Sequence, residues 1–163
     1  MHLKTRELCL LSVGAALMFV LQIVMAPLPN IEPASLFLIV ITCAFGKKAL
    51  LSAAVFILLE GLIHGFGLWW FFYLYAWPVL IALVLLVRPF IGDSAWGWAL
   101  ISGIYGLCFG LLYALLFLFT GSFETFLSTW IAGFPFDISH CIGNFVLCLL
   151  LYIPMMRIVN KLK

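Results

Sequence analysis

The chain consists of long apolar stretches separated by short segments that hold most of its prolines, turn glycines and charged residues. A helix needs about 20 predominantly apolar residues to cross the hydrocarbon core of a bilayer. The pattern predicts an all-α, polytopic membrane protein with a single domain over residues 1–163. Its six transmembrane helices are expected at residues 8–26, 34–46, 49–64, 68–87, 98–119 and 135–156.

The composition indicates lipid as the surroundings of this fold. The chain is 67% hydrophobic and 9% charged, whereas soluble domains carry about 25% charged residues. The net charge of +2 is too small to suggest nucleic-acid binding. The expected partners are therefore the bilayer and small molecules or proteins within it.

The positions of the basic residues predict a topology. Positive charge is retained on the cytoplasmic side when a membrane protein inserts. Placing every basic residue inside gives six crossings, with the N and C termini in the cytoplasm. The residues are Lys4, Arg6, Lys47, Lys48, Arg88, Arg157, Lys161 and Lys163.

The segment at residues 27–33 contains three prolines and is expected to be stiff and non-helical. The predicted helix that follows, residues 34–46, is shorter than a full crossing. Irregular backbone at membrane depth is tolerated where it is buried in protein or lines a cavity. These features predict an outward-facing pocket with a loop over it.

Glu60 lies well inside an apolar helix, and His64 lies one turn further along the same face. An ionisable group at that depth is costly and normally faces a cavity or a partner. The pair is interpreted either as part of a ligand pocket or as a structural contact between helices.

Asp137, His140 and Asn144 share one face of the last predicted helix. Because Pro135 is expected near the start of this helix, Asp137 is also a candidate for a helix cap. The stripe is interpreted as pocket lining or as a set of interhelical hydrogen bonds.

Aromatic residues are dense at the start of the fourth predicted helix, where Trp70 and Tyr73 are candidates for stacking on a ligand ring. The alternative is an aromatic belt at the lipid interface. Small residues at Ser12, Ala15 and Ala16 allow close helix approach, within the chain or to a partner subunit. Gly103, Gly106 and Gly110 are expected to serve internal packing.

The sequence lacks the motifs of several catalytic chemistries. There is no phosphate-binding loop, zinc-protease motif or nucleophile-elbow motif. The five cysteines form no C-x-x-C pair and are interpreted as small buried hydrophobes. No metal, cofactor, catalytic residue or ATP hydrolysis by this chain is expected.

The chain resembles the membrane-embedded substrate-binding subunits, the S components, of energy-coupling factor (ECF) vitamin transporters. The resemblance rests on size, six crossings, the small-residue patch of the first helix, the rigid loop and above all residues 130–144. In that family two alanines four apart on the first helix contact the coupling subunit. Here Ser12 replaces the first of them and Ala16 retains the second.

The resemblance implies a binder of a vitamin or vitamin-like micronutrient in the plasma membrane of a prokaryote. A transmembrane coupling subunit and two ATPase subunits would drive import, and the loaded S component would topple to release its ligand inside. The ligand is expected to contain a ring, of the cobalamin or queuosine-precursor type, with riboflavin, pyridoxine and thiamin types open. The substrate-binding residues expected are Asn30, Glu32, Glu60, His64, Trp70, Tyr73, Asp137, His140 and Asn144.

Two other functions remain open from sequence. A self-sufficient secondary transporter would use Glu60 and His64 as a proton relay. An intramembrane enzyme would use His140 and Asp137 as acid and base.

Overall fold

A computed structural model describes residues 4–28 and 31–163. The described residues form a bundle of helices without strands. The elements are α1 (Thr5–Met25), α2 (Ala34–Phe45), the 3₁₀ helix η1 (Gly46–Lys48), α3 (Ala49–His64), α4 (Leu68–Ile91), α5 (Ala95–Leu107), α6 (Phe109–Ala114), α7 (Phe117–Thr120) and α8 (Phe123–Leu162).

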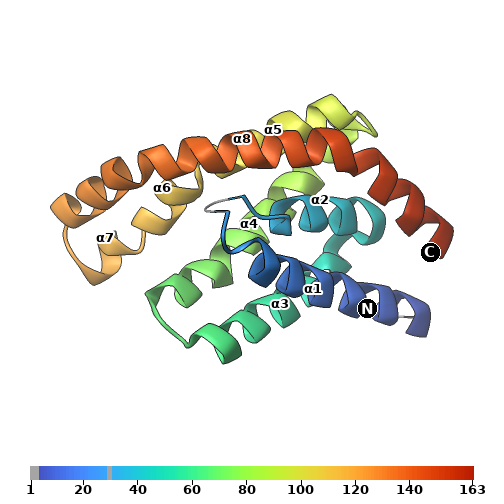
Figure 1. Ribbon diagram of the computed structural model, residues 1–163, viewed down its shortest axis with the longest axis horizontal. Helices are drawn as coiled ribbons and strands as arrows, with labels where there is room; N and C mark the ends of the chain where they lie inside the picture. The colour runs from blue at the N-terminus through green and yellow to red at the C-terminus, as the bar shows by residue number, and fades with distance from the viewer. Residues whose placement is uncertain (1–3, 29–30) are drawn as a thin grey trace.

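Helix α2 is the centre of the bundle. All of its residues except Phe37 are buried, and it contacts α1, α3, α4, α5 and α8 (Figure 1). Gly46 ends α2 with a φ of 61°, a left-handed conformation that favours glycine. The following 3₁₀ turn reverses the chain, so α3 packs back against α2.

Within the described part of the chain, five helical segments are long and apolar enough to cross a membrane: Thr5–Met25, Ala34–His64, Leu68–Ile91, Ala95–Thr120 and Phe123–Leu162. The second combines α2, η1 and α3. Large apolar side chains such as Val24, Leu62 and Phe90 are exposed on the outside of the bundle. These features indicate a multi-pass membrane protein.

Three predicted boundaries are wrong. Helix α4 continues through Arg88 and Pro89 to Ile91, so the connection that follows is shorter than expected. The helix predicted at residues 98–119 is divided into α5, α6 and α7. The last helix begins at Phe123 and not near Pro135, which leaves no long loop at residues 120–129.

The early start of α8 has a local cause. Ser122 is its N-cap, and the Ser122 hydroxyl accepts a hydrogen bond from the backbone N–H of Thr125 at 3.2 Å. Pro135 therefore lies inside the helix, a position that membrane helices tolerate. At 1.5 Å per residue the 40 residues of α8 extend about 60 Å, well beyond the hydrocarbon core.

Both termini lie at the same end of the bundle (Figure 1), and several basic side chains are fixed there. Lys48 Nζ is 2.7 Å from the Glu7 carboxylate, which joins the α2–α3 turn to the start of α1. Lys163 Nζ donates a hydrogen bond to the Ala44 carbonyl near the same turn. Asp93 of the α4–α5 turn and Arg157 of α8 line one small cleft. We call this end of the bundle the basic end.

Candidate functional site

A cavity of about 340 Å³ opens at the end of the bundle opposite the basic end. It lies where α1 and α3 end and α4 begins, beneath the loop that joins α1 to α2. The sequence-based expectation of a pocket under this loop is therefore confirmed in position. Its lining consists of Gln22, Ile23, Met25, Ala26, Leu28, Ile31, Glu32, Glu60, His64, Trp69 and Tyr73.

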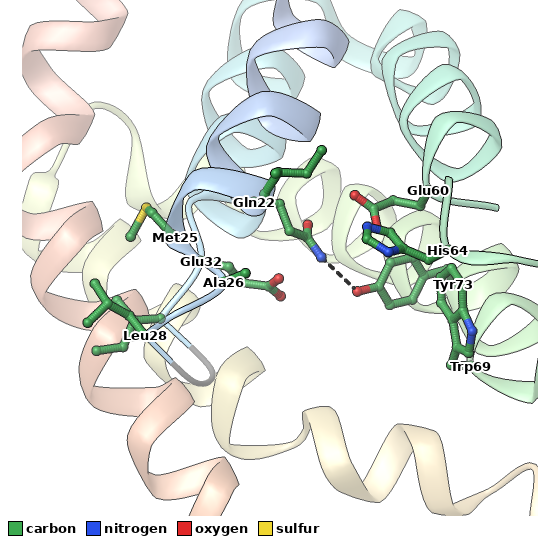
Figure 2. Close-up of a pocket in the computed structure, with 11 residues that line it drawn as sticks. Gln22, Met25, Ala26, Leu28, Glu32, Glu60, His64, Trp69 and Tyr73 are labelled. Atoms are coloured by element: carbon green, nitrogen blue, oxygen red, sulfur yellow. Dashed lines mark hydrogen bonds and ion pairs between the residues drawn. The ribbon is translucent and has the colours of Figure 1, made fainter. Parts of the chain in front are cut away.

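Figure 2 shows how the polar groups of this cavity are arranged. Glu32 points from the loop toward Gln22 and Tyr73, while Glu60 and His64 lie together on α3. The Tyr73 hydroxyl accepts a hydrogen bond from Gln22 Nε2 at 3.2 Å. This contact ties α1 to α4 across the cavity.

Glu60 is only 3% exposed. Its Oε2 atom is 3.7 Å from His64 Nε2, whereas its buried Oε1 atom has no hydrogen-bond partner among the described residues. The His64 side chain is half-exposed. A buried carboxyl oxygen without a partner is costly, so the cavity contains an acceptor that a ligand can satisfy.

Glu32 approaches the cavity from the loop. Its Oε1 atom is 3.5 Å from Nε2 of the buried His140, so the loop is held against α8. Burial, and secondarily the negative charge of Glu60, raise the pKa of the Glu32 carboxyl to about 7. Proton uptake or a cation close to Glu32 would relieve this energetic cost.

Trp69 and Tyr73 form an aromatic wall, with ring centroids 5.4 Å apart in an edge-to-face arrangement. A second cavity of about 360 Å³ shares both residues and is also lined by Gly110 and Asp137. The two cavities therefore adjoin across this wall. A flat ring would find an aromatic surface in either of them.

The polar stripe of α8 is buried, as its shared face predicted, but its members contact different neighbours. Asp137 Oδ1 accepts a hydrogen bond from the backbone N–H of Gly110 at 2.8 Å. Asp137 therefore caps the start of α6, and the prediction that it caps its own helix is wrong, because α8 begins far upstream. Asn144 Nδ2 donates to the Ser35 hydroxyl at 3.2 Å and to the Ser102 carbonyl at 3.3 Å.

The structure brings Glu32, Glu60, His64 and Tyr73 together at the first cavity, and places His140 in contact with Glu32. Asn144 lies deeper, where it joins α8 to α2 and α5. Asp137 lines the second cavity. Trp70 Nε1 donates to the Ile57 carbonyl at 2.9 Å, away from the cavity lining, and Asn30 is outside the described residues.

Of the lining residues that were not expected from sequence, Trp69 and Gln22 matter most for the chemistry of the cavity. Trp69 takes the place expected for Trp70, because periodicity alone does not tell which consecutive aromatic faces inward. Gln22 did carry a signal, since it is the single glutamine of the chain and lies in an apolar helix. A polar group there usually faces protein.

On α1, Ser12 and Ala16 are exposed on one face, whereas Ala15 is fully buried in the core. Ala15 is therefore part of the internal packing and does not belong to an exposed contact patch. Gly103 and Gly106 of α5 and Gly110 of α6 face α8, which agrees with internal packing.

The described residues contain no group of three or more His, Cys, Asp or Glu that is arranged to hold a metal ion. No protein-family model, curated protein or solved structure matches the chain. The functional argument therefore depends on the geometry of the site.

Proposed function

We propose that this chain is a membrane-embedded binder of a vitamin-like micronutrient, the S component of an ECF-type importer. The observation that carries the proposal is the cavity beneath the α1–α2 loop, which collects buried polar groups at the end away from the basic residues. With the basic end in the cytoplasm, this cavity opens toward the outside. That orientation suits capture of a scarce nutrient.

Six crossings follow if α2 and α3 each cross, since the glycine turn and η1 fold them into a hairpin. Both are short for a crossing, and α2 is shielded from lipid by its neighbours. An even number of crossings places both termini on one side, in agreement with their common end in Figure 1.

The volume of the cavity and its aromatic residues restrict which ligands can bind. Pockets for small molecules occupy roughly 300–1,000 Å³, and about 340 Å³ is at the lower limit of this range. Such a volume favours a compact ring compound, such as a queuosine precursor, over the much larger cobalamin. Trp69 and Tyr73 supply the surface for the ring.

The proposed contact with a coupling subunit is the exposed Ser12–Ala16 face of α1. Small side chains there allow a partner helix to approach closely. The face lies in the middle of α1, within the membrane-spanning segment, where a transmembrane coupling subunit can reach it. The absence of a phosphate-binding loop in the sequence agrees with an energy source on other subunits.

Transport assays test the proposal. The small molecule that co-purifies with the detergent-solubilised protein is identified by mass spectrometry and supplied in radiolabelled form. We expect proteoliposomes to accumulate it only when the coupling subunit, both ATPases and ATP are present. Ala16→Trp should abolish uptake and leave binding unchanged, because it blocks the helix contact.

Val24→Trp is the matched control, since Val24 is exposed on the same helix near its other end. It should transport normally. Recovery of no bound micronutrient from purified protein, or uptake by this chain alone, would contradict the proposal.

One observation favours a second candidate, a proton-coupled secondary transporter. The buried face of α8 carries the polar side chains Asp137, His140 and Asn144, and the Tyr152 hydroxyl lies further along it toward the basic end. Buried hydroxyls of Thr42, Ser102 and Tyr152 lack partners among the described residues, and such groups are often satisfied by buried water. Uptake by the chain alone after a pH step would establish this function.

A further inference from the structure

The cavity lies in a region of the molecule that has no fixed positive charge. All eight Lys and Arg residues belong to the termini, the α2–α3 turn and the C-terminal end of α4. The α1–α2 loop, the α3–α4 turn and the α7–α8 turn contain none. Two carboxyl side chains, Glu32 and Glu60, nevertheless line the same cavity. We call them the carboxylate pair.

The two members of the pair come from different elements and reach the cavity from different sides. Glu32 extends from the α1–α2 loop, and Glu60 from the last turns of α3 (Figure 2). The titratable groups facing Glu32 are Glu60, Tyr73 and, from α8, His140. The group facing Glu60 is His64, which is half-exposed and 3.7 Å away.

The free protein leaves acceptors of this cavity unsatisfied. Glu60 Oε1 and Gln22 Oε1 are both buried without a hydrogen-bond partner among residues 4–28 and 31–163. Acceptors need N–H or O–H donors, and carboxylates bind charged donors most strongly. An anionic ligand would add repulsion to a site that already holds two acids.

The aromatic wall fits the same ligand class. A cation near the face of a Trp or Tyr ring is attracted by the ring quadrupole, and a flat ring can pack on Trp69 or Tyr73. Both residues line the cavity together with the carboxylate pair. A ligand with a positive charge, hydrogen-bond donors and a flat ring would therefore find complementary groups for all three in this one cavity of about 340 Å³.

We propose that the cavity selects a compact ring compound bearing a protonated nitrogen, which donates hydrogen bonds to Glu60 and Glu32 while its ring lies on Trp69 and Tyr73. This inference rests on the proposed micronutrient-binding function and names its substrate class. His64 occupies the place beside Glu60 in the free protein, and the ligand nitrogen takes its place.

Matched probes test the inference with the full-length protein in mild detergent. Pyridoxamine and benzamidine carry a protonated nitrogen at pH 8, whereas pyridoxine, benzamide and riboflavin are neutral ring compounds, and biotin is an anion. We expect at least one cationic probe to raise the melting temperature in a concentration-dependent manner. The neutral and anionic probes should bind at least 10-fold more weakly or not at all.

Glu60→Gln and Glu32→Gln should each weaken binding of the cationic probe by about 10- to 100-fold, the range for hydrogen bonds to charged groups. Glu124→Gln is the matched control, because Glu124 is an exposed carboxylate in the first turn of α8, outside the cavity, and it should bind as the wild type does. If Glu60→Gln fails to fold by gel filtration, Glu32→Gln decides the test.

Equal binding of neutral or anionic probes, stabilisation by no cationic probe, or unaltered affinity in the folded glutamine variants would overturn the inference. Different results would contradict the proposed transport function. Partner-dependent import of an anionic compound would contradict only the inference of a cationic ligand. Cation binding combined with uptake by the chain alone would contradict only the assignment to an ECF-type importer.

Discussion

Replacing Gly106 with alanine is expected to destabilise the protein by about 3 kcal/mol, at the upper end of the usual cost of overpacking. A Cβ atom at this position would lie 2.9 Å from both the carbonyl carbon and the carbonyl oxygen of His140. These are backbone atoms of α8, so no flexible side chain can move away. Helices α5 and α8 would have to separate, and with them the contacts that hold Asn144.

The matched control is Gly133→Ala, because a Cβ atom there meets nothing within 4 Å. Both substitutions gain the same intrinsic helix propensity, about 1 kcal/mol, so the difference between them isolates the steric term. Thermal and denaturant unfolding in detergent measure it. Equal stability of the two variants would show that α5 and α8 do not pack through Gly106.

Stability is expected to fall by about 3 kcal/mol as the pH rises from about 4.5 to 7, through Glu32 alone. Burial raises the pKa of this carboxyl from 4.5 to about 7, and one pKa unit corresponds to about 1.4 kcal/mol. Between these values the folded protein binds more protons at Glu32 than the unfolded chain, so raising the pH favours unfolding. Above about pH 7 this contribution is constant.

The difference between wild type and Glu32→Gln gives the measurement, because groups distant from Glu32 contribute equally to both, and the difference therefore reports Glu32 together with its coupling to Glu60 and His140. The glutamine variant should show a flatter profile of melting temperature against pH between about 5 and 7. Its stability should equal or exceed that of the wild type at pH 8. Parallel profiles would mean that Glu32 is solvated and does not point into the cavity.

Much of the fold could be predicted because hydrophobic length and turn residues determine where helices begin and end. The bounds of α3 agree with the prediction at both ends, since Lys47 and Lys48 precede it and Gly65 follows it. Such signals are local in the sequence. The predicted start of α8 is wrong because Pro135, which usually marks a helix start, lies inside this helix, where membrane proteins tolerate proline, and Ser122 provides the N-cap.

The break between α5 and α6 could not be predicted, because the contact that α8 makes there is not local in the sequence. The carboxylate of Asp137 in α8 accepts a hydrogen bond from Gly110, which satisfies a backbone donor at the start of α6. A carboxylate oxygen lies 2.5 Å from where a Cβ atom of Gly110 would be. A side chain at position 110 would therefore displace the Asp137 carboxylate that α8 places there.

Only part of the candidate site could be predicted from the sequence. Glu60 stood out because it is an acid in an apolar helix, and its pairing with His64 followed from helix geometry. The contact of Glu32 with His140 joins residues far apart in the chain, and no periodicity predicts it. Which aromatic side chain faces inward depended on packing, so Trp69 and Trp70 could not be told apart.

Labelling from outside the cell is the most direct test of whether the cavity and the basic end lie on opposite sides of the membrane. The five native cysteines are replaced, and Phe66→Cys and Lys47→Cys are made separately, because both positions are exposed and lie in the α3–α4 and α2–α3 turns. A membrane-impermeant maleimide should label Phe66→Cys in intact cells and Lys47→Cys only after permeabilisation. Labelling of both positions from the same side would contradict the outward-facing cavity and the nutrient capture inferred from it.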